Sequence, residues 1–140
     1  MTYIKSCGFV VYKELRDTRL YLVILNSSGE YGFPKGHMEG NETEHETAIR
    51  ELKEETNLEV QIIEGFRYQI EYEFPNKVDV MKQSVYFLGK YTKNDIVRQE
   101  SEISEAVFVP IKKALELLSF EDTRKILKEA DEYIDSRVSV

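Results

Sequence analysis

The stretch from residue 36 to 58, GHMEGNETEHETAIRELKEETNL, restricts the fold more than any other part of the chain, because it predicts a helix with defined ends. Thr43 followed three residues later by Glu46 is the pattern of a capping box, so the helix should begin there. Asn57 should end it, since Asn tolerates the left-handed conformation in which many helices stop. The apolar side of this helix is expected to consist of Ala48, Ile49 and Leu52.

Three glutamates share one face of this helix. Glu51, Glu54 and Glu55 stand at i, i+3 and i+4, which places their carboxylates side by side. Like charges at this spacing oppose the helix by about 0.2–0.5 kcal/mol per pair. A hard divalent cation with oxygen ligands would offset that repulsion, whereas the alternative is a solvated acidic face. The three glutamates alone favour the solvated face.

A longer pattern that includes these glutamates reverses that preference. Gly36 is followed by five residues, Glu42, seven residues and then RELKEE at positions 50–55, and the pattern closes on Leu58. This spacing resembles the Nudix box, the signature of hydrolases that split nucleoside diphosphates linked to another moiety. The family usually has glycine where Asn41 and Asn57 stand, and here a glycine comes one place early, at position 40. Asn is the commonest residue other than glycine at positive φ, so either turn can survive.

Length and composition restrict the class of protein. A chain of 140 residues with 41% hydrophobic and 32% charged residues predicts one soluble globular domain over residues 1–140. The net charge of −7 argues against a surface that coats nucleic acid. The single cysteine, Cys7, lies in an apolar run and is expected in the core, and the absence of a disulfide fits a reducing cytoplasm. No signal peptide or membrane span is apparent, so a cytoplasmic location is expected.

Apolar runs and turn signals place the remaining elements. Strands are expected at residues 6–12, 20–25, 60–63, 66–74, 84–88 and 106–109, and helices at 111–118 and 120–134. The charged residues 13–19 should join the first two strands, residues 31–37 should form an irregular loop, and Pro75-Asn76 should turn the chain. The last helix should have an apolar stripe of Phe120, Leu127, Ala130 and Ile134. This order predicts an α/β fold with a mixed sheet covered on both faces, and the resemblance implies the Nudix fold, a mixed β-sheet sandwiched between α-helices.

Further marks are similar to one branch of the family, the asymmetrical diadenosine tetraphosphate hydrolases. They are PKGH at Pro34–His37, IEGF at Ile63–Phe66, Tyr72, Lys82 before a strand, and Glu102 six residues before the aromatic Phe108. That branch often has Trp at the positions of Tyr31 and Phe108, whereas this chain has no Trp.

The resemblance implies a Mg²⁺ site, in which Mn²⁺ can substitute. Its ligands would be Glu51, Glu54 and Glu55, with the backbone carbonyl of Lys35. Glu102 would be a further ligand or the general base, and the alternative is a solvated loop glutamate.

Two further charged residues are expected to position these groups. Arg50 can pair with Glu46 or Glu54 at i±4, which would orient a carboxylate rather than bind substrate. Glu42 precedes the helix and is expected to hold the loop rather than take part in chemistry.

Substrate contacts are expected from three basic residues and from aromatic rings. Lys35, His37 and Lys82 are candidates for the polyphosphate, and for His37 a hydrogen bond within the loop is an equal alternative. Stacking contributes about 1–3 kcal/mol per base. By resemblance, Tyr72 is the first candidate to stack on adenine, and Tyr31 is the second.

Together these features predict a Mg²⁺-dependent Nudix hydrolase that acts on a small-molecule nucleotide, with no membrane partner. By resemblance, the substrate is diadenosine tetraphosphate, cleaved at the fourth phosphorus from the bound adenosine into ATP and AMP. Another Nudix specificity is the first alternative, such as pyrophosphate removal from RNA 5′ ends or hydrolysis of nucleoside triphosphates. A nucleotide sensor without turnover is the second, and the presence of every box glutamate and of Arg50 argues against it.

Overall fold

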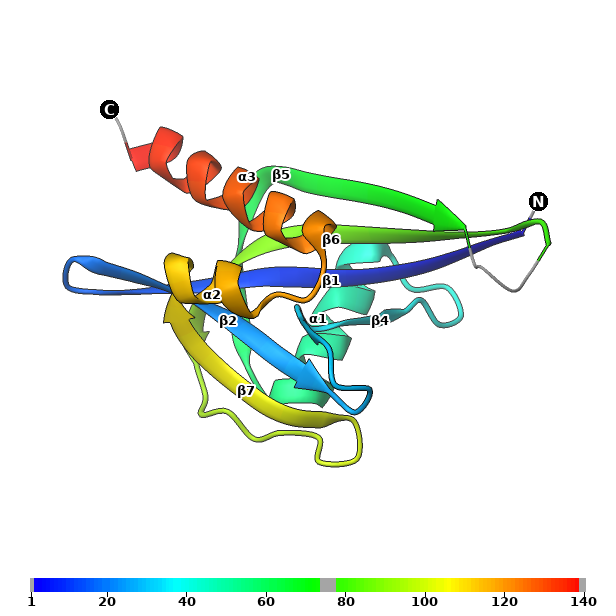
Figure 1. The fold of residues 1–140 in the computed structure, drawn as a ribbon, viewed down its shortest axis with the longest axis horizontal. Helices are drawn as coiled ribbons and strands as arrows, with labels where there is room; N and C mark the ends of the chain where they lie inside the picture. The colour runs from blue at the N-terminus through cyan, green and yellow to red at the C-terminus, as the bar shows by residue number, and fades with distance from the viewer. Residues whose placement is uncertain (1, 74–77, 139–140) are drawn as a thin grey trace.

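Strand β1 (Thr2–Leu15) runs through the middle of the sheet in the computed structural model, which describes residues 2–73 and 78–138 (Figure 1). It pairs with β2 (Thr18–Asn26) in the antiparallel sense and with β6 (Val80–Lys93) in the parallel sense. In the described part of the chain the sheet has seven strands in the order β3-β2-β1-β6-β5, with β4 beside β1 and β7 beside β2. The other strands are β3 (Tyr31–Gly32), β4 (Lys35–His37), β5 (Glu59–Glu73) and β7 (Ile103–Pro110).

Helices cover both faces of this mixed sheet, as predicted. Helix α1 (Glu44–Thr56) packs on one face, and α2 (Ile111–Leu117) and α3 (Glu121–Val138) pack on the other (Figure 1). Successive side chains of a strand point to opposite faces, so the predicted buried strands contribute to two cores. Cys7, Phe9 and Val11 of β1 pack with Leu52 of α1, and the alternate residues Val10 and Tyr12 face α2 and α3.

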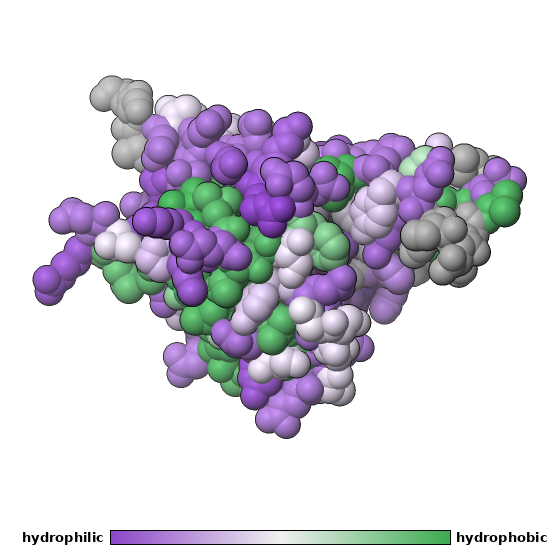
Figure 2. All heavy atoms as spheres, in the orientation of Figure 1, coloured by the Kyte–Doolittle hydropathy of each residue, from purple (hydrophilic) through white to green (hydrophobic). Residues whose placement is uncertain are grey.

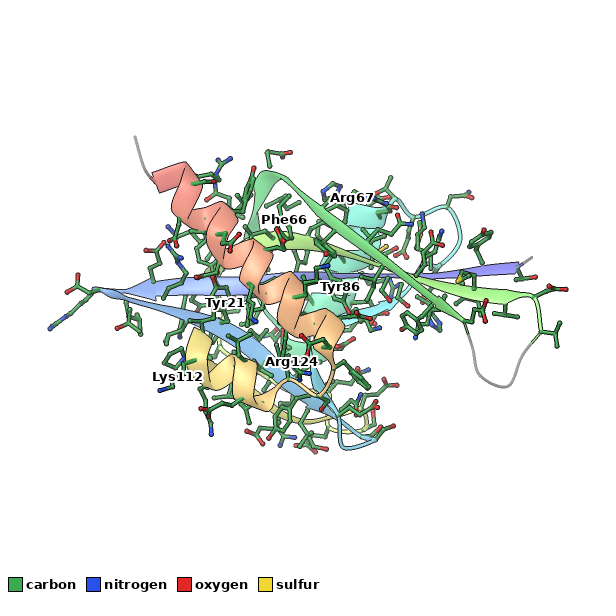
Figure 3. The ribbon with its side chains drawn as sticks, turned by 45° about the horizontal axis from the view of Figure 1, so that its top comes forward. Tyr21, Phe66, Arg67, Tyr86, Lys112 and Arg124 are labelled. Carbon is green, nitrogen blue, oxygen red and sulfur yellow. The ribbon has the colours of Figure 1, made fainter. Side chains whose placement is uncertain are left out.

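The core beneath α3 is rich in aromatic residues. Figure 3 shows Tyr21, Phe66 and Tyr86 between the sheet and this helix, where all three are buried. Of the predicted apolar stripe, Leu127, Ala130 and Ile134 are buried here. Figure 2 shows that polar side chains cover most of the outer surface of α3, and that apolar side chains gather between α3 and α2.

Helix α1 begins and ends as the sequence predicts. Both hydrogen bonds of the capping box between Thr43 and Glu46 are present, and Asn57 ends the helix at φ 69°. Leu52 is buried as expected, but the prediction that Ile49 faces the core is wrong, since this side chain is 47% exposed.

Several predicted boundaries are corrected. Residues 31–37 contain two short strands, β3 and β4, rather than an irregular loop, because Lys35–His37 pairs with β1. The expected strands 60–63 and 66–74 are one strand, β5, interrupted by a bulge at which Gly65 has φ 92°. Phe74 and the turn at Pro75-Asn76 lie outside the described residues.

Two further corrections concern the hairpin formed by β1 and β2 and the start of α3. The charged stretch 13–19 is mostly strand, with a turn only at residues 16–17 between β1 and β2. Phe120 is not part of the α3 stripe, because it precedes the helix and is 51% exposed.

Among the described residues, no helix has the length and apolar character that a membrane crossing requires.

Candidate functional site

Two neighbouring cavities lie beside β4, the short strand that pairs with β1. The larger, of about 580 Å³, is lined by aromatic and polar residues, and the smaller, of about 380 Å³, is lined mainly by charged residues. Lys35 and Lys82 line both cavities. A ligand with an apolar ring at one end and anionic groups at the other would fit this combination.

Segments far apart in the sequence form the smaller cavity. Glu51 and Glu55 come from α1, Gly36 and His37 from β4, and Glu102 from the turn before β7. The α1 carboxylates can approach β4 because Gly36 has no side chain. A Cβ at this position would overlap the carboxylate of Glu51, so the glycine at the start of the box gives Glu51 its place.

Arg50 holds several of the acidic side chains. Its Nε and Nη2 donate to the two carboxylate oxygens of Glu42, at 2.6 and 3.1 Å. Its Nη1 donates to Glu51 at 3.0 Å and to Glu54 at 3.2 Å, while Nη2 also donates to the backbone carbonyl of His37 at 3.0 Å. The predicted pairing with Glu54 is therefore present, whereas Glu46 is engaged in the helix cap instead.

Glu42 holds the loop before α1, as the sequence analysis expects. Besides Arg50, its Oε1 accepts from the backbone N–H of Glu39 and from the hydroxyl of Thr47, both at 2.9 Å. The hydrogen bond from Arg50 is the main reason that the pKa of the Glu42 carboxyl falls to about 2. The side chain therefore remains charged and fixed in position.

Glu55 has the most unusual environment of these carboxylates. It is only 5% exposed, and this burial, together with the hydrogen bond and charge of Glu51, raises its pKa well above the usual range of a carboxyl. The charge of Glu102 acts in the same direction, while the backbone N–H of Lys35 opposes it. A buried carboxylate beside two others is a place where a nearby positive charge is strongly favourable.

The donor set fits a hard divalent cation in its chemistry. All the side chains concerned offer carboxylate oxygens, which Mg²⁺ prefers, and the space beside Gly36 keeps the Glu51 carboxylate against the cavity. Within residues 2–73 and 78–138, however, no three acidic, His or Cys side chains are already arranged to hold a metal ion. Glu54 is one reason that the ligands are not already grouped, because it is hydrogen-bonded to Arg50 and does not line the cavity.

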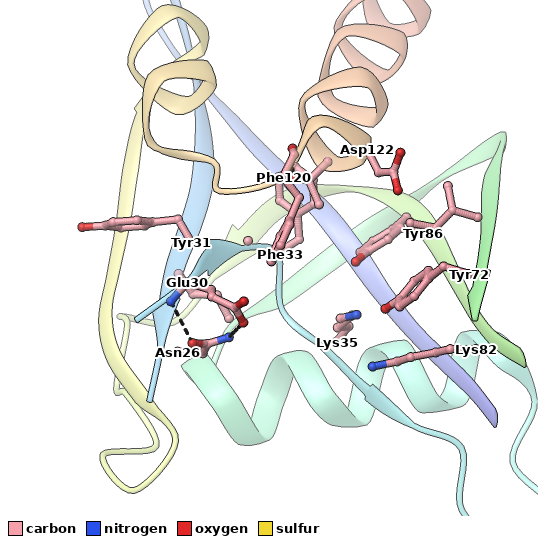
Figure 4. Close-up of a pocket in the computed structure, with 14 residues that line it drawn as sticks. Asn26, Glu30, Tyr31, Phe33, Lys35, Tyr72, Lys82, Tyr86, Phe120 and Asp122 are labelled. Carbon is pink, nitrogen blue, oxygen red and sulfur yellow. Dashed lines mark hydrogen bonds between the residues drawn. The ribbon is translucent and has the colours of Figure 1, made fainter. Parts of the chain in front are cut away.

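The larger cavity has aromatic walls. Tyr72 of β5 and Phe120 are partly exposed, and the buried rings of Phe33 and Tyr86 meet edge to face with centroids 5.8 Å apart. Figure 4 shows Tyr72 and Tyr86 beside each other, with Lys82 next to Tyr72. The ammonium of Lys82 lies 5.8 Å from the centre of the Tyr72 ring, and the two residues are cross-strand partners.

The two lysines change the electrostatics at the junction of the cavities. Burial lowers the pKa of the Lys35 ammonium, whose Nζ donates to Ser84 Oγ at 3.4 Å. Burial alone would raise the pKa of the Tyr72 hydroxyl, but Lys35, Ser84 and Lys82 outweigh it and lower the pKa. An anionic group at this point would therefore meet two cations and a polarised hydroxyl.

Most of the predicted site residues come together here. His37 lines the smaller cavity, but Tyr31 is placed differently, because its ring points away from the larger cavity (Figure 4) and its hydroxyl donates to Glu105 at 3.0 Å. The sequence analysis missed Phe33, Phe120 and Asp122 as cavity residues. Phe33 lies next to PKGH and could have been noticed, whereas only the fold brings the start of α3 to this cavity.

Several known proteins are similar to this chain. The family model described as "NUDIX domain" matches residues 7–130. The chain is 26% identical to bis(5′-nucleosyl)-tetraphosphatase [asymmetrical] of Rattus norvegicus, over 95% of this chain and 97% of the rat protein. It is 33% identical to the RNA pyrophosphohydrolase of a Nitratiruptor strain, over 72% of this chain and 71% of that protein.

A solved structure is similar in fold. The crystal structure of a C. elegans Ap4A hydrolase binary complex superposes with a TM-score of 0.86 at 24% identity, covering 95% of this chain and 98% of that one. This chain therefore shares with the C. elegans structure the mixed sheet between helices that the sequence predicted.

Proposed function

The chain belongs to the Nudix family, and from that premise we propose that it hydrolyses diadenosine tetraphosphate into ATP and AMP in a Mg²⁺-dependent reaction, with Mn²⁺ able to substitute. One observation carries the proposal: an aromatic cavity and a carboxylate-lined cavity share Lys35 and Lys82. An adenine in the first would leave its phosphates at the lysines and direct the chain of phosphates towards the carboxylates.

The aromatic cavity would hold one adenosine. Tyr72 offers a partly exposed ring at the level of the two lysines, and stacking contributes about 1–3 kcal/mol per base. Lys35 and Lys82 would neutralise phosphates close to that base, and His37 would contact phosphates further along the chain. Tyr31 remains a weaker candidate for a base, because its ring points out of the cavity.

The carboxylate cavity would hold the metal. Glu51, Glu54, Glu55 and Glu102, with the backbone carbonyl of Lys35, are the proposed ligands, and Glu102 is also a candidate for the general base. Bound Mg²⁺ neutralises charge on the phosphates and on the leaving oxygen and lowers the pKa of a bound water. Arg50 has a positioning role, since it fixes the directions of the Glu51 and Glu54 carboxylates.

Because only one of the two adenosines would be held, the way the dinucleotide binds would determine which bond breaks. With one base on Tyr72 and the nearest phosphates on Lys35 and Lys82, only a distant phosphorus lies against the carboxylates. We place the attack of water at the fourth phosphorus, so that the oxygen of water enters AMP and ATP is the leaving group. The rat relative named above carries the name of this activity.

Hydrolysis in ¹⁸O-labelled water tests the proposal. Diadenosine tetraphosphate is incubated with the protein and Mg²⁺, and the products are separated and weighed by mass spectrometry. We expect ATP and AMP, with the label in AMP alone. Two molecules of ADP would contradict the asymmetric cut, and label in ATP would overturn the position of attack.

RNA 5′ ends are the second candidate substrate, because the RNA pyrophosphohydrolase relative is 33% identical. Brisk pyrophosphate release from triphosphorylated RNA, without turnover of the dinucleotide, would favour that activity. The net charge of −7 weighs against a long RNA partner. Binding of the dinucleotide or of the RNA without turnover of either would instead favour a nucleotide sensor.

A further inference from the structure

Most polar side chains of the larger cavity already have hydrogen-bond partners within the protein. Asn26 Oδ1 accepts from two backbone N–H groups of its own turn, and its Nδ2 donates to Glu30 Oε1 at 3.4 Å. The hydroxyl of Thr123 donates to the backbone carbonyl of Phe120 at 2.8 Å, and that of Tyr31 is directed out to Glu105. These groups are therefore poorly placed to recognise a ligand.

Asp122 differs from these residues. It lies in the first turn of α3 and lines the cavity, and Figure 4 shows its carboxylate directed towards Tyr86, above Tyr72. Its charge adds to the burial that raises the pKa of the Tyr86 hydroxyl, which is consistent with this proximity. In the described part of the chain, no hydrogen bond or ion pair involves its carboxylate. Its acceptor oxygens are thus open to a ligand in the cavity.

A base stacked on Tyr72 would present its edge to this carboxylate. An ionised carboxylate can only accept hydrogen bonds, and among the groups at a base edge the exocyclic amine is a donor. We propose that Asp122 accepts a hydrogen bond from the exocyclic amine of the bound base, so that the cavity selects bases that carry this amine, adenine among them. This inference rests on the proposed function for the place of the base.

A structural role for Asp122 has to be separated from this one. A carboxylate in the first turn of a helix also interacts favourably with the helix dipole, without touching any ligand. Glu121 provides the matched control, because it lies in the same turn and carries the same charge. It is paired with Arg124 at 2.8 Å and does not line the cavity.

The test compares two ligands that differ only in the amine. Binding of ATP and of purine riboside triphosphate, which lacks the amine, is measured by calorimetry with Mg²⁺ present and with chromatography to verify that both remain intact. We expect wild type to bind ATP about tenfold more tightly, as one charge-assisted hydrogen bond at a partly exposed site allows. Asp122→Ala should remove most of this preference, Asp122→Asn should remove only part of it because its amide oxygen is still an acceptor, and both should leave the affinity for the analogue nearly unchanged.

Three outcomes would overturn the inference. The first is that wild type binds the two ligands equally, and the second is that Asp122→Ala keeps the preference for ATP. The third is that Glu121→Gln loses as much of the preference as the Asp122 variants do, which would indicate a long-range effect of charge. Circular dichroism of each variant verifies folding. Because binding is measured without turnover, a preference that depends on Asp122 would stand even if the dinucleotide is not hydrolysed. The experiment therefore separates a failure of this inference from a failure of the proposed hydrolysis.

Discussion

Replacing Gly36 by alanine should abolish most of the activity while leaving the fold intact. The added Cβ would overlap the carboxylate of Glu51, closer than 2.5 Å to three of its atoms. An ordinary contact needs about 3.5 Å, so the carboxylate must move by about 1 Å or more. Misplacement by about 1 Å can reduce a rate by about 10²-fold, and we expect kcat/KM to fall at least that far.

The effect on stability should be small, for two reasons. The atoms that must move are the end of a flexible side chain rather than backbone. Gly36 also lacks the positive φ that alanine avoids, so the substitution changes the free energy of unfolding by about 1 kcal/mol or less. Thermal melts followed by circular dichroism measure this, and the Tm should stay within about 5 °C of wild type.

A double-mutant cycle with Glu51→Ala provides the control. If the alanine at position 36 acts only by displacing Glu51, it should cause no further loss of kcat/KM once that carboxylate is gone. Near-normal turnover by the Gly36→Ala variant, measured as nucleotide release with Mg²⁺, would refute the reasoning. So would losses that multiply in the double variant.

Substitutions at three other positions test two parts of the site and one group of ion pairs outside it. Glu54→Gln should lower kcat and kcat/KM together by orders of magnitude with the Tm retained, and near-normal turnover would exclude Glu54 from the chemistry. Tyr72→Ala should raise KM for the dinucleotide more than it lowers kcat, and Tyr72→Phe should be mild because the ring remains. Hydrogen bonds from Arg67 and Lys5 outweigh the effect of burial and lower the pKa of the Glu44 carboxyl to about 2. The stability that the ionised Glu44 contributes is therefore complete above about pH 4.5 and is lost as the pH falls towards 2. In acid titrations monitored by fluorescence, Glu44→Gln should therefore lose stability less steeply than wild type over this range, and equal slopes would contradict the assignment.

Local signals predicted helix α1 well. The capping box at Thr43, the αL residue Asn57 and the shared face of the glutamates depend on residues close in sequence, and the structure reproduces the helix ends. The buried strands were also predictable, because apolar residues occupy both faces of β1, β2 and β6. The exposure of Ile49 was not, since which side of a helix meets the sheet depends on where the sheet lies.

The cavities could not be derived from local signals. The pairing of β5 with β6 brings Tyr72 and Lys82 together, and only the packing of α3 across the sheet adds Asp122 to the same cavity. The short strand β4 was missed for a similar reason, since its pairing with β1 is a long-range contact that three residues do not reveal. Arg50 could have been paired with Glu42 only by knowing how the loop before α1 folds back.

The separation of the two cores has a consequence for how such a chain can diversify. The acidic helix α1 is anchored in one layer, and Phe120 and Asp122 belong to the chain segment that covers the other. Substitutions at distant sites with no shared partners add nearly independently. If α1 holds the metal and Asp122 contacts the base, as proposed, descendants of this chain could change their nucleotide preference around α3 while α1 stays unchanged.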